Sequence, residues 1–144
     1  MVTLTYKHLF NDNFLIACHA LEKTRFRDFK SPKNTLKILK AIAAESETAK
    51  SVFKTQFDPL FKKDEGGNCI PVRIEKDKNG RIINKGEVFS PFEVVEGKEE
   101  EYKQKFKEFG DTEFTVDAEK IDGDMILEVT MTPVMVGVLE DLFC

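Results

Sequence analysis

Residues 31–61 read SPKNTLKILKAIAAESETAKSVFKTQFDPLF, and this stretch decides the fold. Ser31 is suited to cap a first helical turn, and Pro32 fits the first helical position, where a missing N–H is harmless. The apolar side chains that recur every three or four residues are Leu36, Leu39, Ile42, Ala43, Ala49, Val52, Phe53, Phe57, Leu60 and Phe61. This spacing predicts one long amphipathic helix from Ser31 to Phe61.

A second helical stripe precedes this stretch. Its members are Tyr6, Phe10, Phe14, Ala17, Cys18 and Leu21. The spacing predicts a helix from about Thr5 to about Arg27. Pro32 separates the two helices, because the residue before a proline avoids the helical region. Two long helices joined by a short break form an αα-hairpin.

The pattern changes from helical to alternating after Phe61. Asp64–Asn68 contains two glycines and ends the helix. Residues 70–75 alternate apolar and polar side chains, which predicts a half-buried strand. Asn79–Gly80 is a strong hairpin signal, and residues 81–83 are its expected second strand.

Two shorter helices and two more strands are predicted in the last third. Tyr102, Phe106 and Phe109 form the apolar face of a helix over residues 97–109. Gly110 is its expected C-terminal cap. Residues 112–117 and 125–131 read as strands. Thr132 and Pro133 repeat the start signal of Ser31 and Pro32 and predict a final helix.

The fold class that follows is α+β in a single domain, residues 1–144. We expect a long N-terminal αα-hairpin packed with a small, mostly antiparallel β-sheet and two shorter helices. The 144 residues suffice for one buried core. Since there are 13 Phe and no Trp, that core is expected to be rich in phenylalanine.

The three cysteines, Cys18, Cys69 and Cys144, are odd in number and far apart. This argues against a disulfide framework and against a structural zinc site. Cys18 lies on an apolar stripe and is expected to be a small buried hydrophobic residue. No apolar run is long enough for a membrane span. We therefore expect no membrane association and a reducing, cytoplasmic location.

Residues that bind metals are present but poorly spaced. His8 and His19 lie about 16 Å apart along a helix, too far to share an ion. The acidic run at residues 117–124 lacks the carboxylate spacing of a calcium-binding EF-hand loop. The sequence therefore predicts no catalytic residue, no cofactor and no metal site.

Charge is divided unevenly along the chain. Residues 1–63 hold 12 Lys and Arg against 6 Asp and Glu, and residues 64–144 hold 10 against 20. Either the two halves bind oppositely charged partners, or they attract each other within the fold or between subunits. We favour the second explanation, because it needs no outside partner.

The densest group of cations lies between residues 23 and 40. It consists of Lys23, Arg25, Arg27, Lys30, Lys33, Lys37 and Lys40, and we name it the cationic segment. It is the candidate partner-binding surface. Nucleic-acid binding is the less favoured interpretation, since no Gly-rich loop or aromatic motif accompanies these cations.

Residues from about 55 to 143 resemble a family of small proteins of unknown function encoded by tailed bacteriophages. The resemblance lies in KKDEGGN at 62–68, a Glu/Lys-rich helix around Tyr102, EFTVDAEKI at 113–121 and MTPVMVGVLEDLF at 131–143. It implies a product made in the bacterial cytoplasm and supplies no catalytic residue. Such a product would be an accessory protein or a minor component of the virion.

Three functions remain open on the sequence. The first is a non-enzymatic, phage-type accessory protein that binds a host or phage protein. The second is a structural or assembly component that forms a homo-oligomer through its opposed charges. The third and least favoured is a small enzyme that uses the acids of residues 117–124 with His8 or His19.

Overall fold

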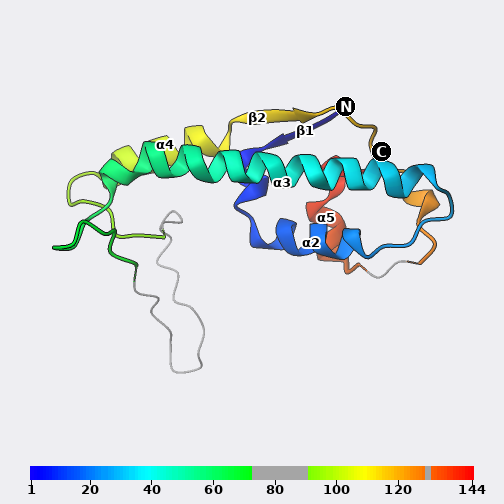
Figure 1. Ribbon diagram of the computed structural model, residues 1–144, viewed down its shortest axis with the longest axis horizontal. Helices are drawn as coiled ribbons and strands as arrows, with labels where there is room; N and C mark the ends of the chain where they lie inside the picture. The colour runs from blue at the N-terminus through cyan, green and yellow to red at the C-terminus, as the bar shows by residue number, and fades with distance from the viewer. Residues whose placement is uncertain (73–90, 129–130) are drawn as a thin grey trace, which may run out of the picture. The chain divides into compact units, whose positions relative to one another are not determined.

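The computed structural model describes residues 1–72, 91–128 and 131–144 (Figure 1). Two short strands, five helices and three 3₁₀ turns are assigned within these ranges, and the fold is α+β as the sequence predicts. In chain order they are β1 (Val2–Thr5), α1 (Tyr6–Leu9), α2 (Asp12–Glu22), α3 (Lys30–Phe57), η1 (Asp58–Leu60), α4 (Glu99–Gly110), β2 (Glu113–Val116), η2 (Gly123–Met125), α5 (Pro133–Val138) and η3 (Glu140–Leu142).

The chain divides into two compact units. The first unit comprises Met1–Ser51 and Phe109–Cys144, and the second comprises Val52–Glu108. The last residues of α3 and most of α4 belong to the second unit. The assignment of residues 1–144 to one domain stays a prediction.

The sheet of the first unit joins distant parts of the sequence. β1 pairs antiparallel with β2, and Val2 lies opposite Val116. Val2, Leu4 and Val116 are buried, so one face of this pair covers the core. The sequence prediction missed β1, because the strand that it pairs with lies at the other end of the first unit's sequence, at Glu113–Val116.

The second strand predicted in this region, at residues 125–131, is wrong. Met125 ends the 3₁₀ turn η2, and Ile126 makes only an isolated bridge to Phe26. Residues 129–130 lie outside the described residues.

The predicted helix from Thr5 to Arg27 is broken into α1 and α2. The side chain of Asn11 accepts hydrogen bonds from the backbone N–H groups of Asn13 (2.9 Å) and Phe14 (3.3 Å), and so caps α2. An asparagine in this role starts a new helix instead of continuing the old one. The apolar stripe itself is confirmed, because Phe14, Ala17 and Leu21 are fully or almost fully buried.

The long helix α3 begins one residue earlier than predicted, and its cap is different. Asp28 accepts hydrogen bonds from the backbone N–H (3.4 Å) and the hydroxyl (3.0 Å) of Ser31. A carboxylate at a helix start accepts first-turn donors as a serine hydroxyl does, and it also suits the positive end of the helix dipole. Pro32 still lies in the first turn. Leu36 was assigned to the buried stripe, but it is 50% exposed.

Aromatic rings form the core of the second unit. Phe57 is fully buried and packs edge-on against Tyr102, with ring centroids 5.3 Å apart. Phe53 stacks on Phe57 at 4.5 Å, and Phe61 lies 5.9 Å from Tyr102. The predicted Phe-rich core is confirmed here. The predicted turn at Asn79–Gly80 and its flanking strands fall outside the described residues or at their edge.

The two remaining helix ends differ in outcome. Gly110 is the last residue of α4, and its φ is not positive, so its prediction as a left-handed cap is wrong. A Cβ at this position would lie 3.0 Å from Cγ of Lys7, so close packing favours glycine here. At α5 the cap prediction is confirmed, because Thr132 accepts a hydrogen bond from the N–H of Met135.

Candidate functional site

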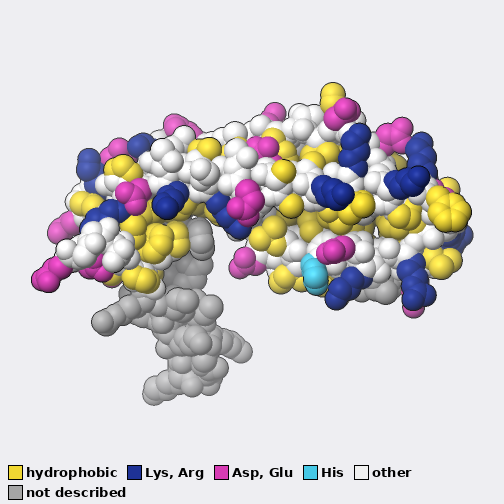
Figure 2. Space-filling model, viewed as in Figure 1, with side chains coloured by type: hydrophobic (Ala, Val, Ile, Leu, Met, Phe, Trp, Pro, Cys, Tyr) yellow, Lys and Arg dark blue, Asp and Glu magenta, His cyan; other side chains and the backbone are white. Residues whose placement is uncertain are grey.

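The cationic segment lies on the surface of the first unit. All seven of its side chains are exposed, three at or after the end of α2 and four on α3. Figure 2 shows dark blue Lys and Arg side chains along this part of α3. All seven cations are therefore accessible to a partner.

Only one member of the cationic segment has an ion-pair partner among the described residues. Lys30 Nζ lies 3.2 Å from Glu119 Oε2, while Asn34 donates a 2.7 Å hydrogen bond to the Glu119 carbonyl. A second contact between the basic and acidic halves joins Lys7 to Asp111 at 2.8 Å. Attraction within the fold thus explains part of the uneven charge, but it leaves six exposed cations of the segment without an ion pair in the parts of the chain that are described.

Exposed apolar side chains accompany these cations. Phe29 lies between Arg27 and Lys30 and is 91% exposed, and Leu36 lies between Lys33 and Lys37. The sequence analysis did not single out Phe29, because an isolated Phe beside a helix start carries no signal of its exposure. The surface is therefore cationic with apolar points, rather than purely cationic.

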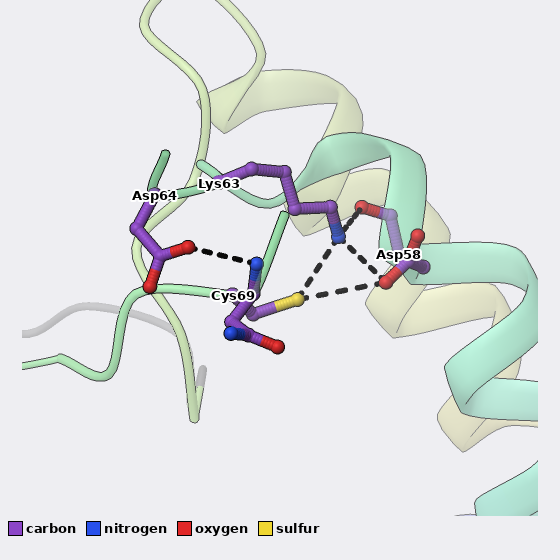
Figure 3. Close-up of polar contacts among 5 residues, drawn as sticks. Asp58, Lys63, Asp64 and Cys69 are labelled. Carbon is purple, nitrogen blue, oxygen red and sulfur yellow. Dashed lines mark hydrogen bonds and ion pairs between the residues drawn. The ribbon is translucent and has the colours of Figure 1, made fainter. Parts of the chain in front are cut away.

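A second cluster of reactive groups lies in the second unit. We name Asp58, Lys63 and Cys69 the thiol cluster. The Lys63 ammonium donates hydrogen bonds to Asp58 Oδ1 (2.6 Å) and to Cys69 Sγ (3.0 Å), as Figure 3 shows. Cys69 Sγ donates in turn to the same carboxylate oxygen at 3.5 Å. The three groups form a closed triangle of polar contacts.

The loop at residues 64–68 brings Lys63 and Cys69 together. The Asp64 carboxylate accepts hydrogen bonds from the N–H groups of Gly66 and Asn68, both at 2.9 Å. Gly67 has φ of +80°, a conformation that glycine adopts without strain. Lys63 and Cys69 then pair as an isolated antiparallel bridge. The Asp-Glu-Gly-Gly-Asn turn was visible in the sequence and could have indicated this pairing.

The charged forms of Lys63 and Asp58 stabilise each other. The pKa of Lys63 is raised, first by its hydrogen bond to Asp58 and then by the one to Cys69. The pKa of Asp58 is lowered, chiefly by the hydrogen bond from Lys63. Lys63 therefore stays an ammonium and Asp58 stays a carboxylate at neutral pH.

An apolar cavity adjoins the thiol cluster. Its volume is about 440 Å³, which lies in the range of small-molecule sites. It is lined by Phe53, Lys54, Asp58, Phe61, Asn68, Cys69 and Phe92. The cavity thus places three aromatic rings next to one thiol and one carboxylate.

The two histidines that were considered as metal ligands, His8 and His19, each contact a different carboxylate. His8 Nε2 lies 3.0 Å from Asp141 Oδ2, and His19 Nδ1 lies 3.5 Å from Glu22 Oε2. Within residues 1–72, 91–128 and 131–144, no group of three His, Cys, Asp or Glu side chains is arranged to hold a metal ion.

The remaining two thiols have different surroundings. Cys18 is half-buried, and burial raises its pKa to about 12, which suits the predicted apolar role. Cys144 is exposed and donates a 3.3 Å hydrogen bond to the Ile121 carbonyl. Of the three cysteines, Cys69 is the one whose thiol contacts an ammonium group among the described residues.

No protein-family model, curated protein or solved structure matches this chain. In the described part of the chain, every helix is too short or too polar to cross a lipid bilayer.

Proposed function

We propose that this protein is a non-enzymatic accessory protein that binds an acidic surface of another protein through its cationic segment. The observation that supports this proposal is the set of six exposed cations that have no ion-pair partner among the described residues, in a segment that also contains the 91% exposed Phe29. Unpaired surface cations speed the encounter with an acidic partner.

Phe29 adds apolar contact area to a surface that is otherwise cationic. Aromatic side chains dominate the energy of many interfaces because they bury a large apolar area when they enter a pocket. Exposed ion pairs alone contribute little, about 1 kcal/mol or less each. A partner with acidic residues around an apolar pocket fits this surface best.

The setting that we propose is the bacterial cytoplasm, in a cell that expresses phage genes. Three unpaired cysteines fit a reducing compartment. The phage context rests on the sequence resemblance alone.

The test is a comparison of two variants with the same change in charge. K33E/K37E reverses two cations of the segment, and K62E/K107E reverses two exposed lysines elsewhere. Proteins are captured by each variant from nuclease-treated bacterial lysate, and each candidate is then purified and its affinity measured by calorimetry. We expect K33E/K37E to weaken binding at least tenfold and K62E/K107E to leave it within about twofold.

Three results would overturn the proposal. The first is equal loss of binding in both variants. The second is capture from untreated lysate that is lost when the lysate is treated with nuclease, which would indicate nucleic acid. The third is a salt-sensitive increase in native mass with no partner bound, which would indicate self-assembly of the kind that the charge division first suggested.

A further inference from the structure

The thiol cluster has no role in the proposed binding function. A thiol that only fills space needs no charged neighbours, yet Cys69 Sγ contacts both an ammonium and a carboxylate. The cluster also lies beside an apolar cavity. Nucleophilic cysteines are partly exposed and often lie next to a lysine or an arginine, as Cys69 does.

We propose that Cys69 is an acylation site, which takes an apolar acyl group from an acyl thioester and places its chain in the cavity lined by Phe53, Phe61 and Phe92. The geometry that supports this is the 3.0 Å contact between Lys63 Nζ and Cys69 Sγ at the cavity wall. None of the residues of this site belongs to the cationic segment, so the proposal is independent of the binding function proposed above.

The reaction exchanges one thioester for another. Cys69 Sγ forms a bond to the acyl carbon and loses its proton to water. The bond from that carbon to the sulfur of the donor breaks, and the departing thiolate takes up a proton. The products are the acyl thioester of Cys69 and the free thiol of the donor, so no oxidant or reductant is needed.

Lys63 stabilises the negative charge that develops on the carbonyl oxygen when Cys69 attacks the acyl group. When Sγ attacks a carbonyl carbon, the oxygen becomes negative two bonds away from the sulfur, within reach of the ammonium. In disulfide exchange the charge develops on the leaving sulfur, on the far side of the attacked atom. The position of Lys63 beside Sγ therefore suits an acyl donor better than a disulfide.

Lys63 does not compete for the acyl group. A lysine attacks a thioester only as a free amine, and the hydrogen bonds to Asp58 and Cys69 keep this one protonated. Asp58 thus acts as a positioning residue. Its Oδ1 accepts a 2.6 Å hydrogen bond from Lys63 Nζ and so holds the ammonium next to the sulfur.

The experiment uses octanoyl-coenzyme A with the full chain and measures intact mass, followed by peptide mapping. We expect one octanoyl group, removed by hydroxylamine, on Cys69. Cys18 and Cys144 in the same molecule are internal controls, so the comparison needs no variant to fold. Acetyl-coenzyme A is expected to react at least tenfold more slowly, because its two-carbon chain buries much less apolar surface in the cavity.

Variants separate positioning from simple exposure of the thiol. We expect K63Q to lower the rate of octanoylation about a hundredfold, as for the loss of one oxyanion donor, and K63R to restore part of it. Acylation spread over all three cysteines would overturn the proposal. So would equal rates with acetyl and octanoyl donors, or selective oxidation of Cys69 by hydrogen peroxide without acylation.

Discussion

The Tyr6 hydroxyl donates a 2.8 Å hydrogen bond to the Glu45 carboxylate and so joins the first turn of α1 to α3. The Tyr6 side chain is only 7% exposed, and its ring packs edge-on against Phe109. Removal of the hydroxyl leaves a half-buried carboxylate without this donor. We expect Y6F to lower the free energy of unfolding by about 1.5–3 kcal/mol, the range for a hydrogen bond to a charged group. Urea unfolding measures this difference, and an unchanged midpoint would show that the bond adds no stability.

The same pair predicts a dependence on alkaline pH. The pKa of Tyr6 is raised above 10.0, first by the hydrogen bond to Glu45, then by burial, then by the charge of Glu45. The folded state therefore holds the phenol proton more tightly than the unfolded state does. The stability that this adds is complete below about pH 10 and is lost as the pH rises through the folded pKa. The difference in stability between wild type and Y6F should thus be constant near neutral pH and shrink above about pH 10, as urea unfolding at several pH values would measure. A difference that grows with pH would contradict the assignment.

Phe57 is expected to be the most sensitive position of the second unit. It is fully buried and contacts the rings of Phe53 and Tyr102. F57A should lower stability by about 3–5 kcal/mol, because it leaves a cavity among aromatic rings. The matched control is F29A, which removes a phenyl ring that is 91% exposed and should change stability by less than about 0.5 kcal/mol. Thermal unfolding of the two variants side by side would reveal a reversed order if the buried core were assigned wrongly.

Two adjacent glycines offer a test of the loop that forms the thiol cluster. Gly67 has positive φ, so G67A should cost about 1–2 kcal/mol. Gly66 lacks positive φ, and a Cβ there would meet its nearest neighbours at 3.4 Å, an ordinary contact, so G66A should be nearly neutral. Denaturant unfolding of both variants measures the two changes in stability. Equal changes would mean that Gly67 does not have a positive φ.

Local patterns in the sequence predicted the helices better than their ends. The aromatic face of α4 and the cap at Thr132 follow from spacing and from side-chain chemistry within one turn. The cap of α3 did not follow, because Asp28 and Ser31 both suit that role and only their geometry shows that Asp28 is the acceptor. The strand β1 was missed for another reason: its pairing partner lies at Glu113–Val116, and no local pattern reports a distant partner.

The two candidate sites differ in the same way. The cationic segment is evident from the sequence, because seven cations lie between residues 23 and 40. Their exposure agrees with the usual behaviour of lysine and arginine. The thiol cluster depends on the turn at Asp64–Asn68, which reverses the chain between Lys63 and Cys69. The cavity beside it depends on Phe92, which is separated from Phe61 in sequence but packs 5.2 Å from it. Sequence spacing alone does not report such a contact.

The antiparallel pairing of Val2 with Val116 also sets an order of events during synthesis. β1 precedes the second unit in the chain and leaves the ribosome before it, but its partner strand β2 is complete only after Val116 has been made. The second unit, Val52–Glu108, is continuous and is fully synthesised before that point. Domains fold as their segments emerge from the ribosome. The second unit can therefore fold while β1 of the first unit is still unpaired. A nascent chain whose emerged part ends between Glu108 and Glu113 would therefore hold a complete second unit and an open first one.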